Sequence, residues 1–495
     1  EGLYRALPLT LEIRTTKETG RGLYSTTNYR PGDVIFSVKP HVAALSLSHL
    51  DGYCSSCFGV GDGVDLKRCT GCKIVRYCTP ACQTRDWTFH KHECNALHQW
   101  MKAASAESPG EARPPSDAIR CLGRILWRIQ KLGASHIWAK EYRSMQSRMS
   151  SLPKDADPFN SEVHTHLAHG VVGYLGLTSP DQLEPYGIRS AGDLVDLISR
   201  FTTNTFTATT PTLSPLGACV APSVALINHS CDPNAVVVFP RAGGETSKDI
   251  EPLLQVVAIK HIRPGDEVLT SYIDTTLPRE LRQQSLKETY HFTCKCPLCS
   301  PAIGTPVDMR EAMWCPKRCG GLCVLPTEQD SFTRCTRCNA VVKDIDAILD
   351  ALRIGQEALE KAERVQDSEP DKALQLAEKL GQILQSASLV PGAHPLLALD
   401  QATHQTGSFL PMATEKQKEA QQTLDDAIRA ATRANTGLNQ VLTYGHPVRG
   451  VCLAELGKLL TVDEPAPKDV ENGDVNSMSL PPVNSPSTRL QDRIG

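Results

Sequence analysis

Residues 54–94 read CSSCFGVGDGVDLKRCTGCKIVRYCTPACQTRDWTFHKHEC, and this stretch decides how the chain can fold. It holds four close pairs of soft metal ligands, namely Cys54/Cys57, Cys69/Cys72, Cys78/Cys82 and His90/Cys94. Zinc in structural sites takes four tetrahedral thiolate or imidazole ligands, and a segment this short cannot bury a core of its own. The spacing therefore predicts two structural zinc ions, which supply the missing folding energy.

A disulfide framework is the alternative for a chain of 495 residues with 19 cysteines. Disulfides belong to oxidising compartments, whereas zinc ligands come in close pairs that often include histidine. The pairing found here favours zinc. The sequence has no secretory h-region and no apolar run of about 18 residues, the length that spans a bilayer. We therefore expect a location in the nucleus and cytoplasm, with no membrane contact.

Two further groups of cysteines lie downstream. Cys294-x-Cys296-x2-Cys299 provides three ligands, so a closed zinc site needs a fourth from elsewhere. Cys315-x3-Cys319 with Cys335-x2-Cys338 predicts a zinc-ribbon-like site, in which Cys323 is an alternative ligand. Degenerate ribbons without metal are the alternative there. Outside these groups we expect buried apolar thiols at Cys121, Cys219, Cys323 and Cys452.

The remaining sequence alternates between strand and helix patterns. Residues 9–44 are typical of strands, residues 103–116 of a polar linker, and residues 117–200 of helices. The sequence Arg-Pro-Gly-Asp occurs at 30–33 and at 263–266, and Pro-Gly suits the centre of a type II turn. Each copy is expected to lead the chain into a strand.

Helical periodicity returns in the C-terminal part of the chain. From Ile345 onward, apolar residues recur at i, i+3, i+4 and i+7 up to Leu460, which predicts an array of helical hairpins. The tail from Thr461 is rich in Pro, Ser and Asn with few large apolar residues, so we expect it to be disordered.

Four separated segments resemble the signature stretches of a SET domain. They are Gly20-Arg21-Gly22-Leu23, Asn228-His229-Ser230-Cys231, Glu267-Val268-Leu269-Thr270-Ser271-Tyr272 and Tyr290-His291-Phe292-Thr293-Cys294. Residues 54–94 resemble a MYND zinc finger, with Tyr77 and Trp87 at matching positions. Together with the C-terminal helices, the chain from about residue 5 to 460 resembles the SMYD family of protein-lysine methyltransferases.

This resemblance implies an α+β fold, in which a SET β-fold carries an inserted MYND finger and a helical insert and is followed by a Cys-rich post-SET element and a TPR-like helical array. The implied segments are 1–50 (N-terminal SET), 51–95 (MYND finger), 96–200 (linker and helical insert), 201–275 (core SET), 276–300 (post-SET), 301–340 (zinc ribbon), 341–460 (helical domain) and 461–495 (tail).

The resemblance also assigns the zinc ligands. One finger ion would take Cys54, Cys57, Cys78 and Cys82, and the other Cys69, Cys72, His90 and Cys94. Cys231 would complete the post-SET site with Cys294, Cys296 and Cys299. Three zinc ions are expected, and four if Cys315, Cys319, Cys335 and Cys338 also bind one. Since protein ligands close each site, all are expected to be structural.

The implied activity is methyl transfer from S-adenosylmethionine to lysines of histones or other proteins. Such an in-line displacement depends mainly on positioning, and it needs a neutral amine and apolar aromatic walls. The expected catalytic residues are Tyr272, Tyr290 and Phe206. The expected cofactor-binding residues are Gly20, Arg21, Gly22, Leu23, Asn204, Asn228, His229, Tyr272, Tyr290 and Phe292.

Three positions depart from the family pattern, and two of them, Thr19 and Ala225, motivate an alternative function. Thr19 replaces a basic residue before the first glycine, Arg21 replaces Asn, and Ala225 replaces a small hydroxyl residue. The alternative is a weakly active or inactive adaptor that binds partners through the finger and the helical array. Expected partners are protein substrates and, at the finger, proline-containing peptides. The net charge of −3 disfavours DNA binding, and we expect a monomer.

Overall fold

The computed structural model describes residues 3–4, 7–61, 65–107, 110–147, 162–241, 252–302, 304–366, 368–407 and 417–463. The chain divides into two compact units. The first comprises Glu1–Ile273 and Gln283–Cys296, and the second comprises Asp274–Arg282 and Pro297–Gly495. Both strands and helices are present, so the expected α+β class is confirmed. No helix within these ranges is long and apolar enough to cross a membrane.

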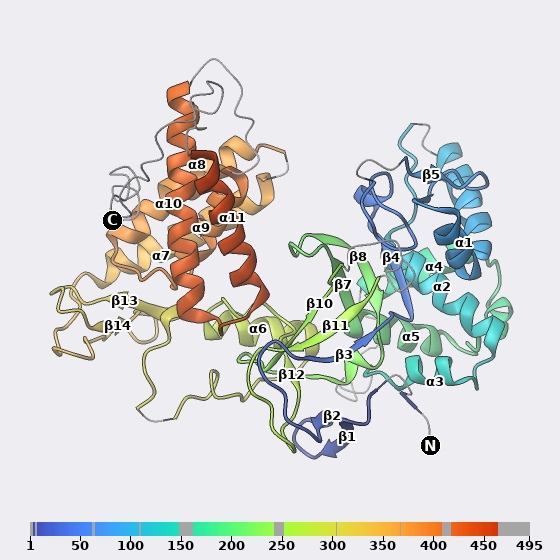
Figure 1. Cartoon of the computed structure of the whole chain (residues 1–495), viewed down its shortest axis with the longest axis horizontal. Coiled ribbons are helices and arrows are strands. Elements are labelled where there is room, and N and C mark those ends of the chain that lie inside the picture. Colours follow the sequence, from blue (N-terminus) through green and yellow to red (C-terminus); the bar gives the residue numbers. More distant parts are fainter. Residues whose placement is uncertain are drawn as a thin grey trace, which may run out of the picture. The chain divides into compact units, whose positions relative to one another are not determined.

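Short strands in small sheets form the centre of the first unit (Figure 1). One sheet has the order β10-β11-β3, from Ala235–Val238, Leu254–Ala258 and Val34–Val38. A second has the order β4-β8-β7, from Val42–Leu45, Pro215–Val220 and Thr205–Thr209. The hairpin of β1 (Leu11–Thr16) and β2 (Gly20–Ser25) and the parallel pair of β9 (Asn228–His229) and β12 (Leu269–Thr270) complete the strand set around the candidate site.

Both Arg-Pro-Gly-Asp sequences form the expected turns. Gly32 and Gly265 have φ values of 95° and 92°, a conformation that glycine adopts without strain. In each turn the aspartate side chain accepts a hydrogen bond from the backbone N–H of the arginine three residues earlier, at 2.7 Å for Asp33 and 2.8 Å for Asp266. The first turn leads directly into β3, and the second leads toward β12.

Helices surround one side of this unit. They are α1 (Pro80–Glu107), α2 (Asp117–Leu132), α3 (Ile137–Ser144), α4 (Glu162–Leu175) and α5 (Ala191–Asn204). A buried apolar core joins α2, α4 and α5 to the finger, whose own short hairpin is β5 (Lys67–Arg68) with β6 (Arg76–Tyr77). Helix α1 runs through the predicted finger boundary at residue 95 and ends at Glu107. The linker predicted from residue 103 therefore begins later than expected.

The second unit is mainly helical. Helices α7 (Ile345–Val365), α8 (Pro370–Ser386), α9 (Leu396–Gly407), α10 (Gln417–Val441) and α11 (Pro447–Asp463) each pack on the next one along the chain, which confirms the expected helical array. The antiparallel pair β13 (Ala312–Trp314) and β14 (Leu322–Val324) packs against their core. Helix α11 extends three residues into the predicted tail, and residues 464–495 lie outside the described ranges.

Candidate functional site

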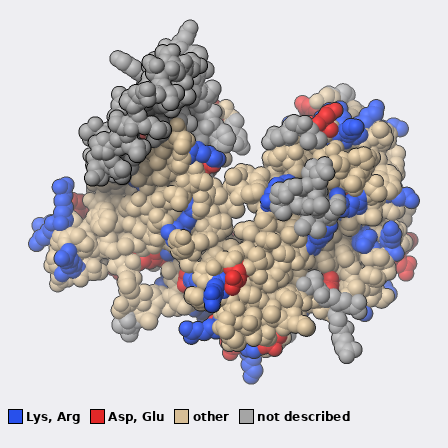
Figure 2. Space-filling view, viewed as in Figure 1, with Lys and Arg blue, Asp and Glu red and all other residues tan. Residues whose placement is uncertain are grey.

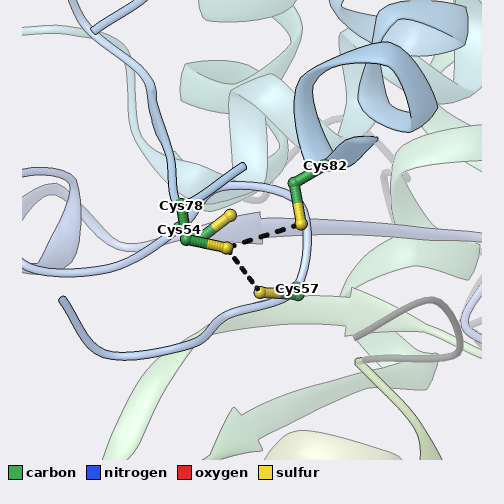
Figure 3. Close-up of side chains that lie close together, drawn as sticks. All are labelled: Cys54, Cys57, Cys78 and Cys82. Carbon is green, nitrogen blue, oxygen red and sulfur yellow. Dashed lines mark hydrogen bonds between the residues drawn. The ribbon is translucent and has the colours of Figure 1, made fainter. Parts of the chain in front are cut away.

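The four cysteines of the first finger group converge on one point. Figure 3 shows their sulfur atoms pointing toward one another, with Cys82 placed by the first turn of α1. The Sγ–Sγ distance is 3.7 Å between Cys57 and Cys78 and 3.5 Å between Cys78 and Cys82. Four thiolates around zinc at about 2.3 Å stand about 3.8 Å apart. The group therefore fits a tetrahedral zinc ion.

The second finger group has the same dimensions. Sγ of Cys69 lies 3.7 Å from Sγ of Cys94 and 3.4 Å from Nε2 of His90, and Sγ of Cys72 lies 3.6 Å from the same nitrogen. A Cβ on Gly71 would come within 2.7 Å of Sγ of Cys94, so only glycine leaves the sulfur its room. The four ligand atoms are mutually close enough for one metal ion.

A buried ion-pair network supports His90, and the sequence did not reveal it. Nδ1 of His90 lies 3.0 Å from the Glu93 carboxylate, and both side chains are fully buried. A carboxylate in this position fixes the tautomer in which Nε2 can ligate a metal. Burial alone would raise the pKa of Glu93, but Arg124 and Arg120 hold it well below its usual range.

The same network joins the finger to the rest of the first unit. Arg120 and Arg124 lie one turn apart on α2; Arg120 pairs with Glu93, and Arg124 pairs with both Glu93 and Asp86. Their guanidinium groups also donate to backbone carbonyls of β4, at 3.1 Å and 3.0 Å. The signal in the sequence was Arg120 and Arg124, one turn apart among the apolar residues of α2, with an acidic residue three positions after His90.

The post-SET cysteines come together with Cys231, as the resemblance implied. The ligand atoms of Cys231, Cys294, Cys296 and Cys299 all lie within 4.8 Å of one another. Gln283 holds the loop by hydrogen bonds to both backbone groups of Cys294, at 2.7 Å and 3.0 Å. This group ties the segment that contains Asn228 and His229 to the segment that follows α6 (Arg279–Tyr290).

The ribbon cysteines form a fourth group. Sγ of Cys315 lies 3.6 Å from that of Cys338, and Sγ of Cys319 lies 3.5 Å from that of Cys335. Cys323 is outside this group and is fully buried. Cys121, Cys219 and Cys452 are also buried, as expected for apolar thiols. Four cysteine-containing groups of zinc ligands therefore exist in the described part of the chain.

Aromatic rings from three of the signature segments form one cluster. The Tyr272 ring lies 4.9 Å from the Tyr290 ring and 5.3 Å from the His229 ring, measured between centroids. Phe292 lies 5.9 Å from His229 and 6.5 Å from Tyr290. All four side chains are half-buried. The cluster forms an apolar, rigid surface that is still accessible to solvent.

The hydroxyl of Tyr272 has a defined role in this cluster. It donates to the carbonyl oxygen of Ile227 at 2.6 Å. Burial, followed by the neighbouring Tyr290 and Glu267, raises the pKa of Tyr272, and burial also raises the pKa of Tyr290. Tyr272 is therefore a neutral phenol near pH 7. Its one proton is directed at Ile227, and its oxygen lone pairs remain able to accept a hydrogen bond.

His229 connects the aromatic cluster to the post-SET cysteines. Its Nδ1 accepts from the backbone N–H of Tyr272 at 3.0 Å, so a neutral ring carries its proton on Nε2. Nε2 lies 3.3 Å from Sγ of Cys231 and donates to that sulfur. One imidazole thus joins a metal ligand to the backbone of Tyr272.

The Gly20–Leu23 segment meets Asn228 beside this cluster. Nδ2 of Asn228 donates to the carbonyl oxygen of Arg21 at 3.0 Å and to Oε1 of Glu267 at 2.8 Å. A Cβ on Gly22 would lie 2.1 Å from that carboxylate oxygen, so a larger residue here would displace the Glu267 side chain. Leu23 is buried in the core, and Gly20 is an exposed turn residue with a positive φ.

Other expected site residues have different surroundings. Asn204, at the end of α5, donates to the carbonyl oxygens of Gln146 and Arg200, at 2.8 Å and 2.7 Å. Phe206 lies on β7, partly buried against the central core. The ring contacts found among the described residues do not link Phe206 to the Tyr272 cluster. Their proposed roles at the site therefore rest on the family resemblance.

The three departures from the family pattern also have local explanations. Thr19 closes the β1–β2 turn by hydrogen bonds with the Thr16 hydroxyl. The Arg21 guanidinium donates to the backbone carbonyl of Ser144. Ala225 packs partly buried against the helical core. All three residues are thus accommodated by the fold without strain at the aromatic cluster.

Comparisons with known proteins agree with this arrangement. The MYND finger family matches residues 54–94. N-lysine methyltransferase SMYD2 of Gallus gallus is 32% identical over 290 residues, which cover 59% of this chain and 60% of that protein. SMYD2 of Homo sapiens is 32% identical, covering 57% and 58%. Histone-lysine N-methyltransferase ASHR1 of Arabidopsis thaliana is 28% identical, covering 66% and 64%.

The alignments span about 60% of the length of the curated relatives. Among solved structures, the SET domain of LSMT bound to lysine and AdoHcy aligns with 11% identity over 92% of this chain and 87% of that chain, with a TM-score of 0.32. The chain thus contains a segment that matches the MYND finger, four cysteine-containing ligand groups, and a region similar to SMYD2 and ASHR1.

Proposed function

We propose that this protein is a protein-lysine N-methyltransferase that uses S-adenosylmethionine and acts on lysines of histones or other proteins. The observation that carries the proposal is the meeting of separate signature segments at one place. Asn228, His229 and Tyr272 lie on the parallel β9–β12 pair or directly after it, and Tyr290 and Phe292 pack against them. The similarity to two proteins named as lysine methyltransferases supports the same activity.

The cofactor would supply an electrophilic methyl group on a positively charged sulfur. Its binding residues would be Gly20, Arg21, Gly22, Leu23, Asn204, Asn228, His229, Tyr272, Tyr290 and Phe292. Gly22 lets the Glu267 carboxylate and the Asn228 amide pack directly against the backbone of this segment, which holds Asn228 in place. Asn228 and His229 would orient that ligand, and both are themselves oriented by hydrogen bonds.

The aromatic cluster would receive the lysine side chain. Tyr272, Tyr290 and Phe206 would line its path as catalytic residues. Apolar walls disfavour the ammonium form and so lower the amine pKa from about 10.4. The Tyr272 oxygen, whose proton is directed at Ile227, would accept a hydrogen bond from the amine and align its lone pair for in-line attack.

Four structural zinc ions belong to this proposal, one for each ligand group described above. The proposal also keeps the division of the chain into the segments 1–50, 51–95, 96–200, 201–275, 276–300, 301–340, 341–460 and 461–495. We also propose that the protein acts on protein substrates and binds proline-containing peptides at the MYND finger. It would be a monomer and would act in the nucleus and cytoplasm.

Calorimetry with S-adenosylmethionine and a methylation screen on a peptide library test the proposal. Tyr272→Phe removes the aligning hydroxyl and keeps the ring, and we expect a loss of roughly a hundredfold in methylation rate. Tyr29→Phe is a matched control, because it removes a buried hydroxyl bonded to Thr10 at 2.8 Å outside the cluster. Full activity of Tyr272→Phe would contradict the role given to this tyrosine.

If the chain is an adaptor, calorimetry should show no binding of S-adenosylmethionine. A chain that binds partners but not S-adenosylmethionine at high micromolar concentration, with its zinc content intact, would overturn the enzyme proposal. Thr19 and Ala225 motivate that alternative, and both residues are compatible with the fold.

A further inference from the structure

The zinc-ribbon segment 312–343 carries a charge unlike that of the whole chain. It contains five Lys or Arg residues against two Asp or Glu residues, a net charge of +3, whereas the chain as a whole has −3. Figure 2 shows Lys and Arg gathering over the region of β13 and β14, at the left edge of the view. The near-neutral total therefore conceals a local basic surface.

These basic residues lie within the turns that carry the metal ligands or next to them in the sequence. Lys317 and Arg318 lie between Cys315 and Cys319, Arg334 precedes Cys335, Arg337 lies between Cys335 and Cys338, and Lys343 follows. All five are exposed, and none takes part in an ion pair within the described part of the chain. A zinc ion bound by the four ribbon cysteines would fix the turns and hold the cations in place.

Exposed apolar side chains lie among the cations. Trp314 is 43% exposed, Val324 48% and Phe332 63%. Most aromatic residues in the described part of the chain are buried or half-buried, so two exposed rings within one short segment are unusual. The Arg334 guanidinium lies over the Phe332 ring, 4.8 Å from its centroid, which keeps the ring at the surface beside a positive charge.

The strand arrangement brings these groups together. Trp314 on β13 pairs with Leu322 on β14, and the backbone N–H of Thr336 donates to the carbonyl oxygen of Leu322 at 2.9 Å. The hydroxyl of Thr333 donates to the carbonyl oxygen of Val324 at 2.8 Å. The segment that carries Phe332, Arg334 and Arg337 therefore runs along β14, opposite β13.

Exposed cations without an acidic partner, interleaved with exposed aromatic rings, match one ligand chemistry. Phosphate groups bind the cations, and unstacked bases bind the rings. We propose that the zinc-ribbon segment 312–343 is a binding site for single-stranded nucleic acid. The site is independent of the methyltransferase proposal, because its residues lie outside the aromatic cluster around Tyr272.

Fluorescence anisotropy of the full-length, zinc-loaded chain tests this proposal. The probes are labelled oligo(U), labelled oligo(dT) of equal length, and a duplex of the same length. Both single strands are expected to bind more tightly than the duplex, with an affinity that falls steeply as salt rises. The ratio of oligo(U) to oligo(dT) affinity then distinguishes RNA from DNA as the preferred strand.

Charge-removal variants locate the binding site. A triple variant with Lys317→Gln, Arg318→Gln and Lys343→Gln is expected to reduce the slope of log affinity against log salt concentration by roughly 2. The matched control is Lys67→Gln, Arg68→Gln and Lys73→Gln, which removes three exposed cations from the other zinc module. That control is expected to retain binding. Equal losses in both triple variants would overturn the proposal, as would a wild-type chain that binds neither strand at low salt.

A ring-removal variant tests the stacking part separately. Phe332→Ala is expected to weaken single-strand binding roughly tenfold, since one stacked base contributes about that much. Tyr444→Ala is the control, because Tyr444 is 82% exposed and also lies under an arginine, but is not in the ribbon. Native mass spectrometry should show unchanged zinc content in every variant. Duplex binding equal to single-strand binding would contradict a stacking site.

Discussion

The MYND finger and the zinc ribbon use the same backbone turn to hold their ligands. In each, the N–H of the first cysteine of a pair donates to a carbonyl five or six residues later, as in Cys54 to Gly59 at 2.8 Å and Cys335 to Ala340 at 2.9 Å. The residue after the second cysteine has a positive φ, 60° at Phe58 and 56° at Asn339. Close ligand pairs therefore adopt the same local backbone in both regions.

The surroundings of the two zinc modules differ. In the finger, Glu93 and Asp86 are buried and paired with arginines of α2, and the ligand His90 is itself fully buried. In the ribbon, Cys338 is exposed and the basic residues face solvent. The comparison teaches that ligand spacing predicts the metal site but not the use made of the charges around it.

Loss of one ligand should have its largest effect in the finger. Cys72→Ser is expected to remove one zinc ion and most of the roughly 10 kcal/mol that structural zinc supplies, because α1 and α2 both depend on the group. Hydrogen exchange should rise across 54–94 and α2. Cys338→Ser should also remove one zinc ion by native mass spectrometry, but raise exchange only across 312–343. If hydrogen exchange rose over equally wide regions in the two variants, the finger and the ribbon would not differ in how far their zinc ions stabilise the chain.

Loss of a carboxylate should have the next largest effect. Glu93→Gln leaves Arg120 and Arg124 buried with less compensation, and we expect a loss of about 3–5 kcal/mol in the free energy of unfolding of the first unit. Glu328→Gln, an exposed change in the ribbon, should alter stability by less than about 0.5 kcal/mol. Denaturant unfolding measures both, and a mild effect of Glu93→Gln would mean that the network contributes little.

Acid should destabilise the second unit, which carries the zinc ribbon. Burial lowers the pKa of His394 and of His446 to about 4, against a nearby Asp274 that acts in the opposite direction. An unfolded histidine has a pKa near 6.5, so the unfolded state binds more protons between about pH 6.5 and 4. Stability of the second unit should therefore fall as pH drops through this window, by about 2 kcal/mol per histidine between pH 7 and 5.

Thermal melting at pH 7 and pH 5 measures this difference. His394→Gln should flatten the pH dependence, whereas His261→Gln, a change at an exposed histidine, should leave it unchanged. A pH dependence that persists in full in a variant lacking both His394 and His446 would show that other groups are responsible.

Much of the fold and of the site followed from local sequence signals. The cysteine spacing predicted the ligand groups, the repeated Arg-Pro-Gly-Asp predicted both turns, and apolar periodicity predicted α7 and α8. Each of these signals acts within a few residues, where backbone geometry is strongly constrained. The meeting of Asn228, Tyr272 and Tyr290 required the family resemblance, since no local rule relates segments so far apart.

Long-range partners could not be predicted from the sequence. The pairing of Glu93 with Arg120 joins two helices, and a charged residue in a helix usually faces solvent. The exposure of Trp314 was also hidden, because an aromatic residue in a strand is more often part of a core. Similarly, the bonds of Asn204 to Gln146 and Arg200 depend on how α5 packs.

The hydrogen bonds of His229 have a consequence for the kinetics of the proposed reaction. Both ring nitrogens are engaged, one by the Tyr272 N–H and the other by Sγ of Cys231, and Tyr272 is a neutral phenol because burial raises its pKa. None of these groups can serve as an efficient general base near pH 7. With neither His229 nor Tyr272 acting as the base, we expect the substrate amine to lose its proton to solvent before the chemical step. Turnover at subsaturating substrate should then increase about tenfold per pH unit on the way to the amine pKa.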